Sequence, residues 1–446
     1  MADSSRVFGM YDIRGVYPEE VNEEFAYNLA KAFSQRYKPK TIIVACDVRN
    51  GSQSIKDKLI KSLIEESVDV IDLGIITTDC FLFACSQEKS FGIMVTASHN
   101  PKQFNGFKLE HMNGEPIYHG NGLEKIAKKM QKLGLVNQGK PGKVIQKDYR
   151  KSFSDFVLSN TAVENLKKYK IVVDSSNGTA ATIGDILLDF LNQDIFKLNW
   201  EKDSNFSGHG PNPLDKVAWA SIAAEIKNNK ADFAVAFDSD GDRSIFFDEN
   251  GKFIHPSFVA GVIATEILKS KKKGCVVADL TCSRFFKDCV EKNNGKYITS
   301  KVGRVFIRES MKKHTAIFGA ESSGHCYYKK GNQYVDNSWL TFILMLQILS
   351  ESGKKFSELF KETEHYYISD PLKLIVKSKQ KALETLKAYD KGKMSLLDGV
   401  TVRDKEWWFN VRPSNTEDLL RITIEADTKE IAEQKKDELI ALLKDK

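Results

Sequence analysis

The stretch Phe91–Leu109, FGIMVTASHNPKQFNGFKL, decides the fold. Its apolar run Ile93–Val95 is typical of a buried strand in a parallel sheet, which does not need alternating polar residues. The run ends in the polar segment Thr96–Pro101, and ligands of open α/β sheets usually bind in loops at the carboxyl ends of strands. Pro101 disfavours a helical conformation at the preceding residue, so we expect Ser98 to lie at the tip of an open loop.

The dipeptide Asn105-Gly106 predicts a second turn, which would return Lys108 towards Ser98. Taken by themselves, these two residues are better explained as a capping serine and a solvated lysine, because short motif matches often mislead. The rest of the chain decides between the two interpretations.

The chain has 446 residues, of which 41% are hydrophobic and 28% are charged, and this composition is that of an ordinary globular protein. The net charge of +6 is too small and too dispersed to indicate nucleic acid or a membrane as partner. Seven cysteines without a CxxC pair predict reduced thiols and a cytoplasmic protein. No apolar signal core is present near residue 1, and the longest apolar run, 339–349, is shorter than the ~20 residues of a membrane-spanning helix.

Strands and helices alternate along most of the chain, which predicts right-handed crossovers and mainly parallel sheets. The expected strands are 41–46, 68–73, 93–95, 171–174, 231–237, 244–247, 253–254, 275–279, 296–299 and 316–318. From about Ile368, β-branched and aromatic strands (372–376, 406–411, 420–425) mix with two helices, which indicates an α+β domain. We therefore expect an α/β protein with three tandem mixed α/β domains of similar topology (1–142, 143–252, 253–367) and a C-terminal α+β domain (368–446).

Three aspartates, Asp238, Asp240 and Asp242, follow an apolar strand at alternating positions. Hard oxygen ligands in this spacing suit Mg²⁺ or Ca²⁺. Glu249 stands where a calcium EF-hand loop has its last ligand, but Arg243 stands where that loop needs glycine, and a strand precedes it, so an EF-hand is excluded. An aspartyl nucleophile remains an alternative, with Asp238 attacking, Asp240 as the acid and Arg243 binding the phosphoryl group.

Two further loops carry polar groups. The segment around Arg412 offers the donors that a phosphate dianion prefers, although a polar hairpin turn is the simpler alternative. Its candidate residues are Arg412, Ser414, Asn415, Thr416 and Arg421. After the strand 316–318, Glu321, Ser323 and His325 could bind sugar hydroxyls or simply form a turn.

Four loops in this order resemble the α-D-phosphohexomutase superfamily: TASHNP (96–101), DSDGDR (238–243), AESSGH (320–325) and RPSNTE (412–417). YDIRG (11–15), NGFK (105–108) and PNP (211–213) also match in place. The resemblance covers almost the whole chain. It implies four domains around a central cleft, with a mobile fourth domain that closes on the substrate.

The resemblance also implies roles for single residues. Ser98 would be the phosphoserine, and Arg243 would lie beside it. Asp238, Asp240 and Asp242 would hold Mg²⁺, with the Ser98 phosphate as a further ligand. Glu321 and Ser323 would bind sugar hydroxyls, and the Arg412 loop with Arg421 would bind the substrate's phosphate. The residues that would line the reacting end are Tyr11, Arg14, Lys108 and His325, with Lys108 and His325 as candidates for proton transfer.

The implied reaction passes a phosphoryl group from phosphoserine to a hexose phosphate, and the other phosphate of the 1,6-bisphosphate returns to Ser98. Mg²⁺ would be the cofactor and glucose or mannose 1,6-bisphosphate the activator, in a cytoplasmic monomer or homodimer. Most of the catalysis would come from charge stabilisation and positioning.

The ESSGH loop followed by Cys326-Tyr327-Tyr328 resembles the phosphomannomutase/phosphoglucomutase branch most. The alternatives are a phosphoglucosamine mutase, the aspartyl-nucleophile phosphotransferase and a catalytically silent sugar-phosphate-binding protein. Three departures from the family pattern concern local loop shape: Asp418 where proline is frequent, Thr78-Asp79 where Thr-Pro is common, and Cys46 where glycine or arginine often stands.

Overall fold

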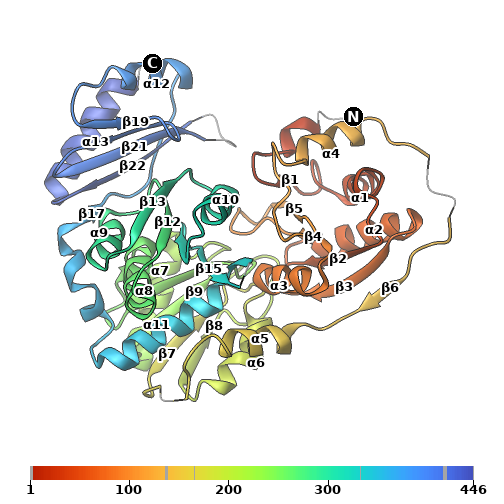
Figure 1. The fold of residues 1–446 in the computed structure, drawn as a ribbon, viewed down its shortest axis with the longest axis horizontal. Helices are drawn as coiled ribbons and strands as arrows, with labels where there is room; N and C mark the ends of the chain where they lie inside the picture. Colours follow the sequence, from red (N-terminus) through yellow and green to blue (C-terminus); the bar gives the residue numbers. More distant parts are fainter. Residues whose placement is uncertain (1–3, 136–138, 165, 332, 415–418, 445) are drawn as a thin grey trace. The chain divides into compact units, whose positions relative to one another are not determined.

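The computed structural model of the protein describes residues 4–135, 139–164, 166–331, 333–414, 419–444 and 446. They fall into two compact units. The first comprises Met1–Ile254 with His325–Phe356, and the second comprises His255–Gly324 with Ser357–Lys446. Figure 1 shows both units and labels many of their helices and strands.

The first sheet of the first unit has the strand order β1-β5-β4-β2-β3-β6. Its strands are β1 (Ile13–Val16), β2 (Thr41–Cys46), β3 (Asp69–Ile75), β4 (Phe91–Val95), β5 (Phe104–Glu110) and β6 (Val144–Gln146). The accompanying helices are η1 (Ser4–Val7), α1 (Glu23–Tyr37), α2 (Ser52–Glu65), α3 (Thr78–Glu88) and α4 (Leu123–Met130), and α1 packs against α2 (Figure 1). All five residues of β4 are buried, as expected for a strand covered on both faces.

Local sequence explains where several of these elements begin. Asn22 accepts a hydrogen bond from the Phe25 N–H at 2.9 Å and caps α1, as its side chain predicts. The turn predicted at Asn105-Gly106 is wrong, because both residues lie inside β5. Gly106 pairs with Arg14 of β1 so closely that a Cβ on it would lie 2.0 Å from the Ile13 carbonyl oxygen. Glycine here serves close strand pairing, and the chain turns within residues 96–103 instead.

The second sheet of this unit has the order β11-β10-β9-β7-β8. Its strands are β7 (Lys170–Asp174), β8 (Asp194–Leu198), β9 (Phe233–Phe237), β10 (Ser244–Asp248) and β11 (Phe253–Ile254), with helices α5 (Arg150–Leu158), α6 (Ala181–Leu187), η2 (Leu188–Phe190) and α7 (Lys216–Asn229). The β10–β11 hairpin predicted from Asn250-Gly251 is confirmed.

The segment His325–Phe356 completes the first unit with the hairpin of β15 (Cys326–Lys330) and β16 (Gln333–Asp336) and the helix α11 (Ser338–Ser352). Helix α11 is apolar on nearly all sides and packs on the second sheet. Trp339 stacks on Phe237 of β9, with ring centroids 4.3 Å apart. Within the described residues, neither α11 nor another helix has the length and apolar character needed to cross a lipid bilayer.

The second unit begins with parallel strands β12 (Cys275–Asp279), β13 (Lys296–Ser300) and β14 (Phe318–Ala320), accompanied by helices α8 (Pro256–Lys271), α9 (Arg284–Lys292) and α10 (Arg304–His314). Helix η3 (Ser357–His365) leads to an antiparallel sheet of order β17-β22-β21-β20-β19, with β18 also paired to β22. Its strands are β17 (Tyr367–Ile368), β18 (Leu372–Leu374), β19 (Lys393–Ser395), β20 (Val400–Arg403), β21 (Trp407–Pro413) and β22 (Leu420–Ala426), and its helices are α12 (Lys379–Lys387) and α13 (Lys429–Leu443).

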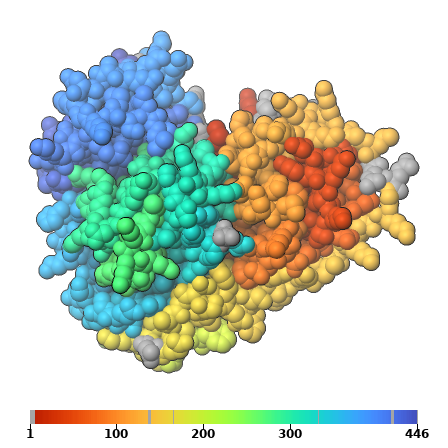
Figure 2. Space-filling model, in the orientation of Figure 1, coloured from red at the N-terminus to blue at the C-terminus, as the bar shows by residue number. Residues whose placement is uncertain are grey.

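The C-terminal sheet and its helices share a separate apolar core, and the blue C-terminal residues gather into a rounded body in the space-filling view (Figure 2). The prediction of α/β units followed by a C-terminal α+β domain is confirmed.

Candidate active site

Ser98 lies in the loop between β4 and β5, and only 2% of its surface is exposed. Its backbone is in the left-handed region, with φ 49°. The Ser98 N–H donates to Thr96 Oγ1 at 2.8 Å, and the Ser98 hydroxyl donates to Asp238 Oδ2 at 3.1 Å. The hydroxyl therefore points at the aspartate loop, which follows β9 in the second sheet of the same unit.

Arg49, a residue whose role the sequence analysis missed, holds this loop in place. Its guanidinium donates to the carbonyl oxygens of Asn100 (2.5 Å), Pro101 (2.9 Å) and Phe104 (3.0 Å) and also to that of Ser98. Arg49 is buried, and Asp47 balances its charge at 3.4 Å. Burial is the main reason that the pKa of Arg49 falls to about 10. The available signal was the Asp-x-Arg spacing at the end of β2.

Asp238, Asp240 and Asp242 are fully buried, and one carboxylate oxygen from each lies within 4.8 Å of the others. Lys108 Nζ lies 2.6 Å from Asp240 Oδ2 and 2.5 Å from Asp242 Oδ2. In the part of the chain that the structure describes, the Oδ1 atoms of Asp240 and Asp242 have no hydrogen-bond partner. Buried carboxylate oxygens without partners are costly, so this donor set fits a hard divalent cation such as Mg²⁺.

The electrostatics of the aspartates agree with a cation site. Burial, followed by repulsion from Asp242 and Asp240, raises the pKa of Asp238 to about 8. Burial acts in the same direction on Asp240, but the Lys108 ammonium outweighs it and holds the pKa of Asp240 far below its usual range. The positive charges of Lys108, Arg243 and Arg14 offset part of the negative charge of these aspartates, and a divalent ion would offset more of it.

His325 lies between the aspartate loop and β16. Its Nδ1 is 2.9 Å from Asp336 Oδ2, and its Nε2 accepts a hydrogen bond from Arg243 Nε at 3.1 Å. Burial lowers the pKa of His325, but the carboxylates of Asp242 and Asp336 outweigh it and the net shift is upward. The Arg243 contact requires an accepting Nε2, so a second ring proton requires the Arg243 side chain to move away.

Tyr11 lies just before β1, and Arg14 is the second residue of that strand. Arg14 pairs with Asp12 at 2.7 Å and donates to the Thr96 carbonyl oxygen at 3.3 Å, so it borders the Ser98 loop. Burial opposes its charge, but Asp12, Asp240 and Asp242 together raise the pKa of Arg14. Tyr11 is half-buried three residues before Arg14.

In the second unit, the loop after β14 is fixed by its neighbour loop after β12. The Ser322 N–H donates to Asp279 Oδ2 at 2.8 Å, and the hydroxyls of Ser322 and Thr281 are 2.7 Å apart. Glu321 is buried. The buried Ser323 hydroxyl has no hydrogen-bond partner among the described residues, so its hydrogen-bonding capacity is unused.

The candidate phosphate loop lies in the same unit, between β21 and β22. Arg412 stands opposite Arg421 across these strands, and Lys373 of β18 stands opposite Arg421 on its other side. Like charges in register destabilise a sheet, so this row of three cations favours a bound anion. The Ser414 N–H donates to the Leu419 carbonyl oxygen at 2.9 Å. Asn415 and Thr416 lie outside the described residues.

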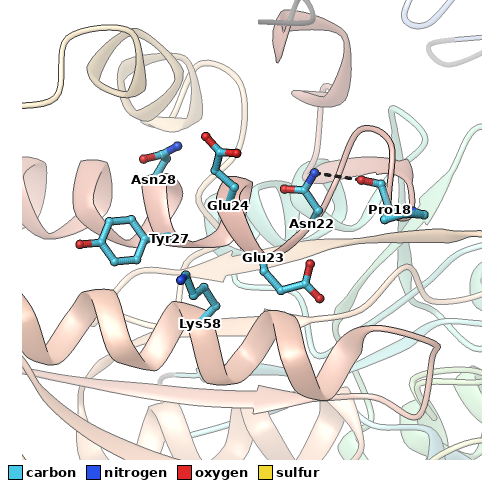
Figure 3. A pocket seen from close by; sticks show the side chains of 7 residues that line it. All are labelled: Pro18, Asn22, Glu23, Glu24, Tyr27, Asn28 and Lys58. Atoms are coloured by element: carbon cyan, nitrogen blue, oxygen red, sulfur yellow. Dashed lines mark hydrogen bonds between the residues drawn. The ribbon is translucent and has the colours of Figure 1, made fainter.

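A surface hollow of about 650 Å³ on α1 and α2 contains none of the predicted site residues (Figure 3). Its lining residues are Pro18, Asn22, Glu23, Glu24, Tyr27, Asn28 and Lys58. Asn22 Nδ2 donates to the Pro18 carbonyl oxygen at 2.9 Å (dashed in Figure 3), and Lys58 Nζ lies 5.6 Å from the centroid of the Tyr27 ring. None of the candidate catalytic or cation-binding residues lines this hollow, so it is not part of the candidate active site.

Four family models match the chain in succession. Their descriptions are phosphoglucomutase/phosphomannomutase alpha/beta/alpha domain I for residues 5–136, domain II for 147–251, domain III for 255–367 and the C-terminal domain for 372–442. The chain belongs to the phosphoglucomutase/phosphomannomutase family. The predicted resemblance to the phosphohexomutase superfamily, and with it the prediction of an enzyme, is confirmed.

Full-length relatives support the same assignment. A phosphomannomutase of Methanocaldococcus jannaschii is 34% identical over 98% of this chain and 97% of its own. A phosphomannomutase of Vibrio cholerae is 32% identical over 98% of each chain. Among solved structures, a phosphoglucomutase/phosphomannomutase family protein of Burkholderia thailandensis has a TM-score of 0.89 at 24% identity, covering 99% of this chain and 97% of that one.

Proposed function

We propose that this enzyme interconverts hexose 6-phosphate and hexose 1-phosphate, with mannose and glucose as the sugars, through a phosphoserine at Ser98 and a 1,6-bisphosphate intermediate. The proposal rests on one observation: the Ser98 hydroxyl points at three buried carboxylates and lies 3.1 Å from Asp238 Oδ2. A capping or solvated serine would not need such surroundings.

The residues of the first unit have distinct tasks in this reaction. Arg49 and the left-handed backbone present Ser98 at a fixed place, which lowers the entropic cost of phosphoryl transfer. Asp238, Asp240 and Asp242 would hold Mg²⁺, with the Ser98 phosphate as a further ligand. When bound, Mg²⁺ offsets the negative charge of the transferring phosphoryl group. Arg243 approaches Asp238 Oδ2 to 3.6 Å and adds positive charge beside Ser98.

Lys108 and His325 are the candidates for proton transfer to and from the sugar hydroxyl. Both lie beside the carboxylates, and the raised pKa of His325 together with the Arg243 contact gives its ring two accessible charge states. Arg14 and Tyr11 would line the reacting end of the substrate.

The residues of the second unit supply binding. Glu321 and Ser323 would accept and donate hydrogen bonds to the sugar hydroxyls, and Arg412, Ser414 and Arg421, with Asn415 and Thr416, would bind the phosphate that does not react. The cation row in the C-terminal sheet supports this assignment. The same loops must receive the bisphosphate in either orientation, because each of its phosphates reacts in turn.

We propose mannose and glucose together because they differ only at the C2 hydroxyl, and Glu321 and Ser323 could satisfy either epimer. A comparison of kcat/KM on mannose, glucose and glucosamine 1-phosphates tests this choice. A large preference for the amino sugar would replace it with a phosphoglucosamine mutase.

The aspartyl-nucleophile alternative has less support. Asp238 Oδ1 accepts hydrogen bonds from the N–H groups of Asp242 and Arg243, and Oδ2 accepts from Ser98. Both of its oxygens are therefore engaged, and its raised pKa lowers the fraction in the nucleophilic form.

The deciding experiment is peptide mass mapping before and after incubation with hexose phosphate. We expect a phosphoryl group on the Ser98 peptide, its loss as bisphosphate appears, and no label in Ser98→Ala. Ser90→Ala, which changes a serine outside this loop, is the matched control. An acyl phosphate on Asp238 would establish the aspartyl mechanism, and no phosphoryl group on either residue after exposure to glucose 1,6-bisphosphate and Mg²⁺ would indicate a binding protein.

The remaining assignments belong to the same proposal. The activator would be glucose or mannose 1,6-bisphosphate, and the enzyme would work in the cytoplasm as a monomer or homodimer without nucleic-acid or membrane partners. The domain boundaries 1–142, 143–252, 253–367 and 368–446 also stay a prediction.

A further inference from the structure

The N-terminal end of α3 contacts the aspartate loop directly. The Thr78 N–H donates to the Asp240 carbonyl oxygen at 2.8 Å, and the Thr78 hydroxyl donates to Asp240 Oδ2 at 2.7 Å. Gly241 has φ +70°, and a Cβ on it would lie 2.8 Å from Thr77 Cγ2. The start of α3 therefore supports the segment that carries Asp240 and Asp242.

Asp79 is the next residue of α3, and only 1% of its surface is exposed. Its Oδ2 lies 2.7 Å from the Ser338 backbone nitrogen and 2.8 Å from Ser338 Oγ, at the start of α11. Ser338 Oγ also lies 2.7 Å from the Gly241 carbonyl oxygen. In the described part of the chain, Asp79 Oδ1 has no hydrogen-bond partner.

The connection that runs from Asp79 through Ser338 Oγ to the Gly241 carbonyl oxygen indicates the charge state of Asp79. The Ser338 hydroxyl has one proton but lies at hydrogen-bond distance from two oxygens that would both be acceptors if Asp79 were ionised. A proton on Asp79 Oδ2 resolves the conflict, because Asp79 then donates to Ser338 Oγ and Ser338 donates to the Gly241 carbonyl oxygen. Oδ2 can still accept the Ser338 N–H.

The surroundings of Asp79 favour the same state. Burial, followed by repulsion from the carboxylates of Asp336 of β16 and Asp242 of the aspartate loop, raises the pKa of Asp79 well above its usual range, although the hydrogen bonds from Ser338 act in the opposite direction. The positive end of the α11 dipole opposes this shift. An ionised Asp79 would also leave the buried Oδ1 charged and without a donor, which costs more than a neutral carbonyl oxygen in the same place.

We propose that Asp79, held as a neutral carboxylic acid, is a positioning residue that fixes the Gly241 carbonyl through Ser338 and so sets the spacing of Asp240 and Asp242. The inference rests on the proposed function, because it assigns these aspartates to the cation. The connection also fixes the start of α11 two residues after Asp336, the partner of His325.

Two measurements on the full-length enzyme test the proposal separately. The first is the infrared difference spectrum between wild type and Asp79→Asn near neutral pH. We expect the C=O band of a protonated carboxyl group in the wild type, lost in the variant. If only a carboxylate band is lost, Asp79 is ionised and the assigned charge state is wrong.

The second measurement is Mn²⁺ binding, followed by electron paramagnetic resonance, beside the melting temperature in EDTA. Ser338→Ala and Asp79→Leu remove the connection, and we expect each to weaken Mn²⁺ binding about tenfold, the effect of one lost buried hydrogen bond. Ser350→Ala, on the same helix but bonded to the Lys167 N–H, is the matched control and should bind as the wild type does.

The outcomes are distinguishable. A lower melting temperature with unchanged Mn²⁺ affinity in both variants would show a structural role only and would overturn the proposal. If Asp79→Leu does not fold, Ser338→Ala alone decides. Failure of the wild type itself to bind Mn²⁺ would refute the cation site, and hence the proposed function, independently of Asp79.

Discussion

Replacement of Arg49 by lysine tests whether the Ser98 loop is held by a planar guanidinium. Arg49 donates to four backbone carbonyl oxygens, of Ser98, Asn100, Pro101 and Phe104. A lysine ammonium has three donors at a single point and cannot reach oxygens spread along seven residues of loop. We expect at least two charge-assisted hydrogen bonds to be lost, at about 1.5–3 kcal/mol each.

The stability and the activity of Arg49→Lys should respond differently. Relaxation and water entry recover part of the loss, so we expect the free energy of unfolding to fall by about 3 kcal/mol. A displacement of Ser98 by about 1 Å is enough to lower kcat about 100-fold, while KM changes little because the substrate-binding loops are intact. Arg49→Met should destabilise more, because it also leaves Asp47 buried without its counter-charge.

The assay combines urea unfolding, steady-state kinetics in the hexose 1-phosphate direction, and the rate at which glucose 1,6-bisphosphate phosphorylates Ser98. Arg150→Lys, which changes an exposed ion pair with Asp148, is the matched control and should alter stability by less than about 0.5 kcal/mol. If Arg49→Lys loses stability but keeps kcat and the phosphorylation rate within a factor of about three, the loop is placed by other contacts and the reasoning fails.

Three further predictions follow from other parts of the structure. Gly241→Ala should weaken divalent-cation binding and lower stability by about 1–3 kcal/mol, because the residue has φ +70° and meets Thr77, whereas Gly210→Ala (φ +92°, nothing within 4 Å) should show backbone strain alone; equal effects in both variants would exclude the Thr77 contact as a cause. Lys373→Gln should raise KM several-fold with kcat unchanged, because one cation of the row opposite Arg421 is lost, while the exposed Lys387→Gln should not; an unchanged KM would place the phosphate elsewhere. His209, 2.7 Å from Asp174, has a raised pKa, because the Asp174 contact outweighs burial. Its stabilisation is complete below about pH 6.5 and is lost as the pH rises through the raised value, so the advantage of wild type over His209→Gln in urea unfolding should shrink as the pH rises above about 6.5; a constant or growing advantage would contradict the sign.

The sequence predicted the elements whose signals are local. Strands β2, β4 and β9 are apolar runs buried on both faces, and the loops at their carboxyl ends hold Asp47, Ser98 and Asp238, the last two as predicted. Strands β8, β17, β19 and the β15–β16 hairpin were not predicted, and neither were β1, β5, β6 and β20. Several of these are short, half-buried or edge strands whose pairing, and not their pattern, makes them strands. The prediction of a turn at Asn105-Gly106 was wrong because strand pairing with β1 keeps this dipeptide extended.

The sequence alone was enough to identify the residues that form the candidate cation loop and the serine loop. Three alternating aspartates predict a cation loop wherever the strand before them ends, and a serine before Asn-Pro predicts an open loop, because both effects act over a few neighbouring residues. Only the tertiary structure decided what holds those loops. Thr78 reaches Asp240 across 162 residues of chain, and Ser338 reaches Asp79 across 259. Such partners leave no periodic or local pattern, since their meeting depends on the packing of whole sheets and helices. It is this packing that places Arg49 against the carbonyl oxygens of the Ser98 loop and Asp79 against Ser338.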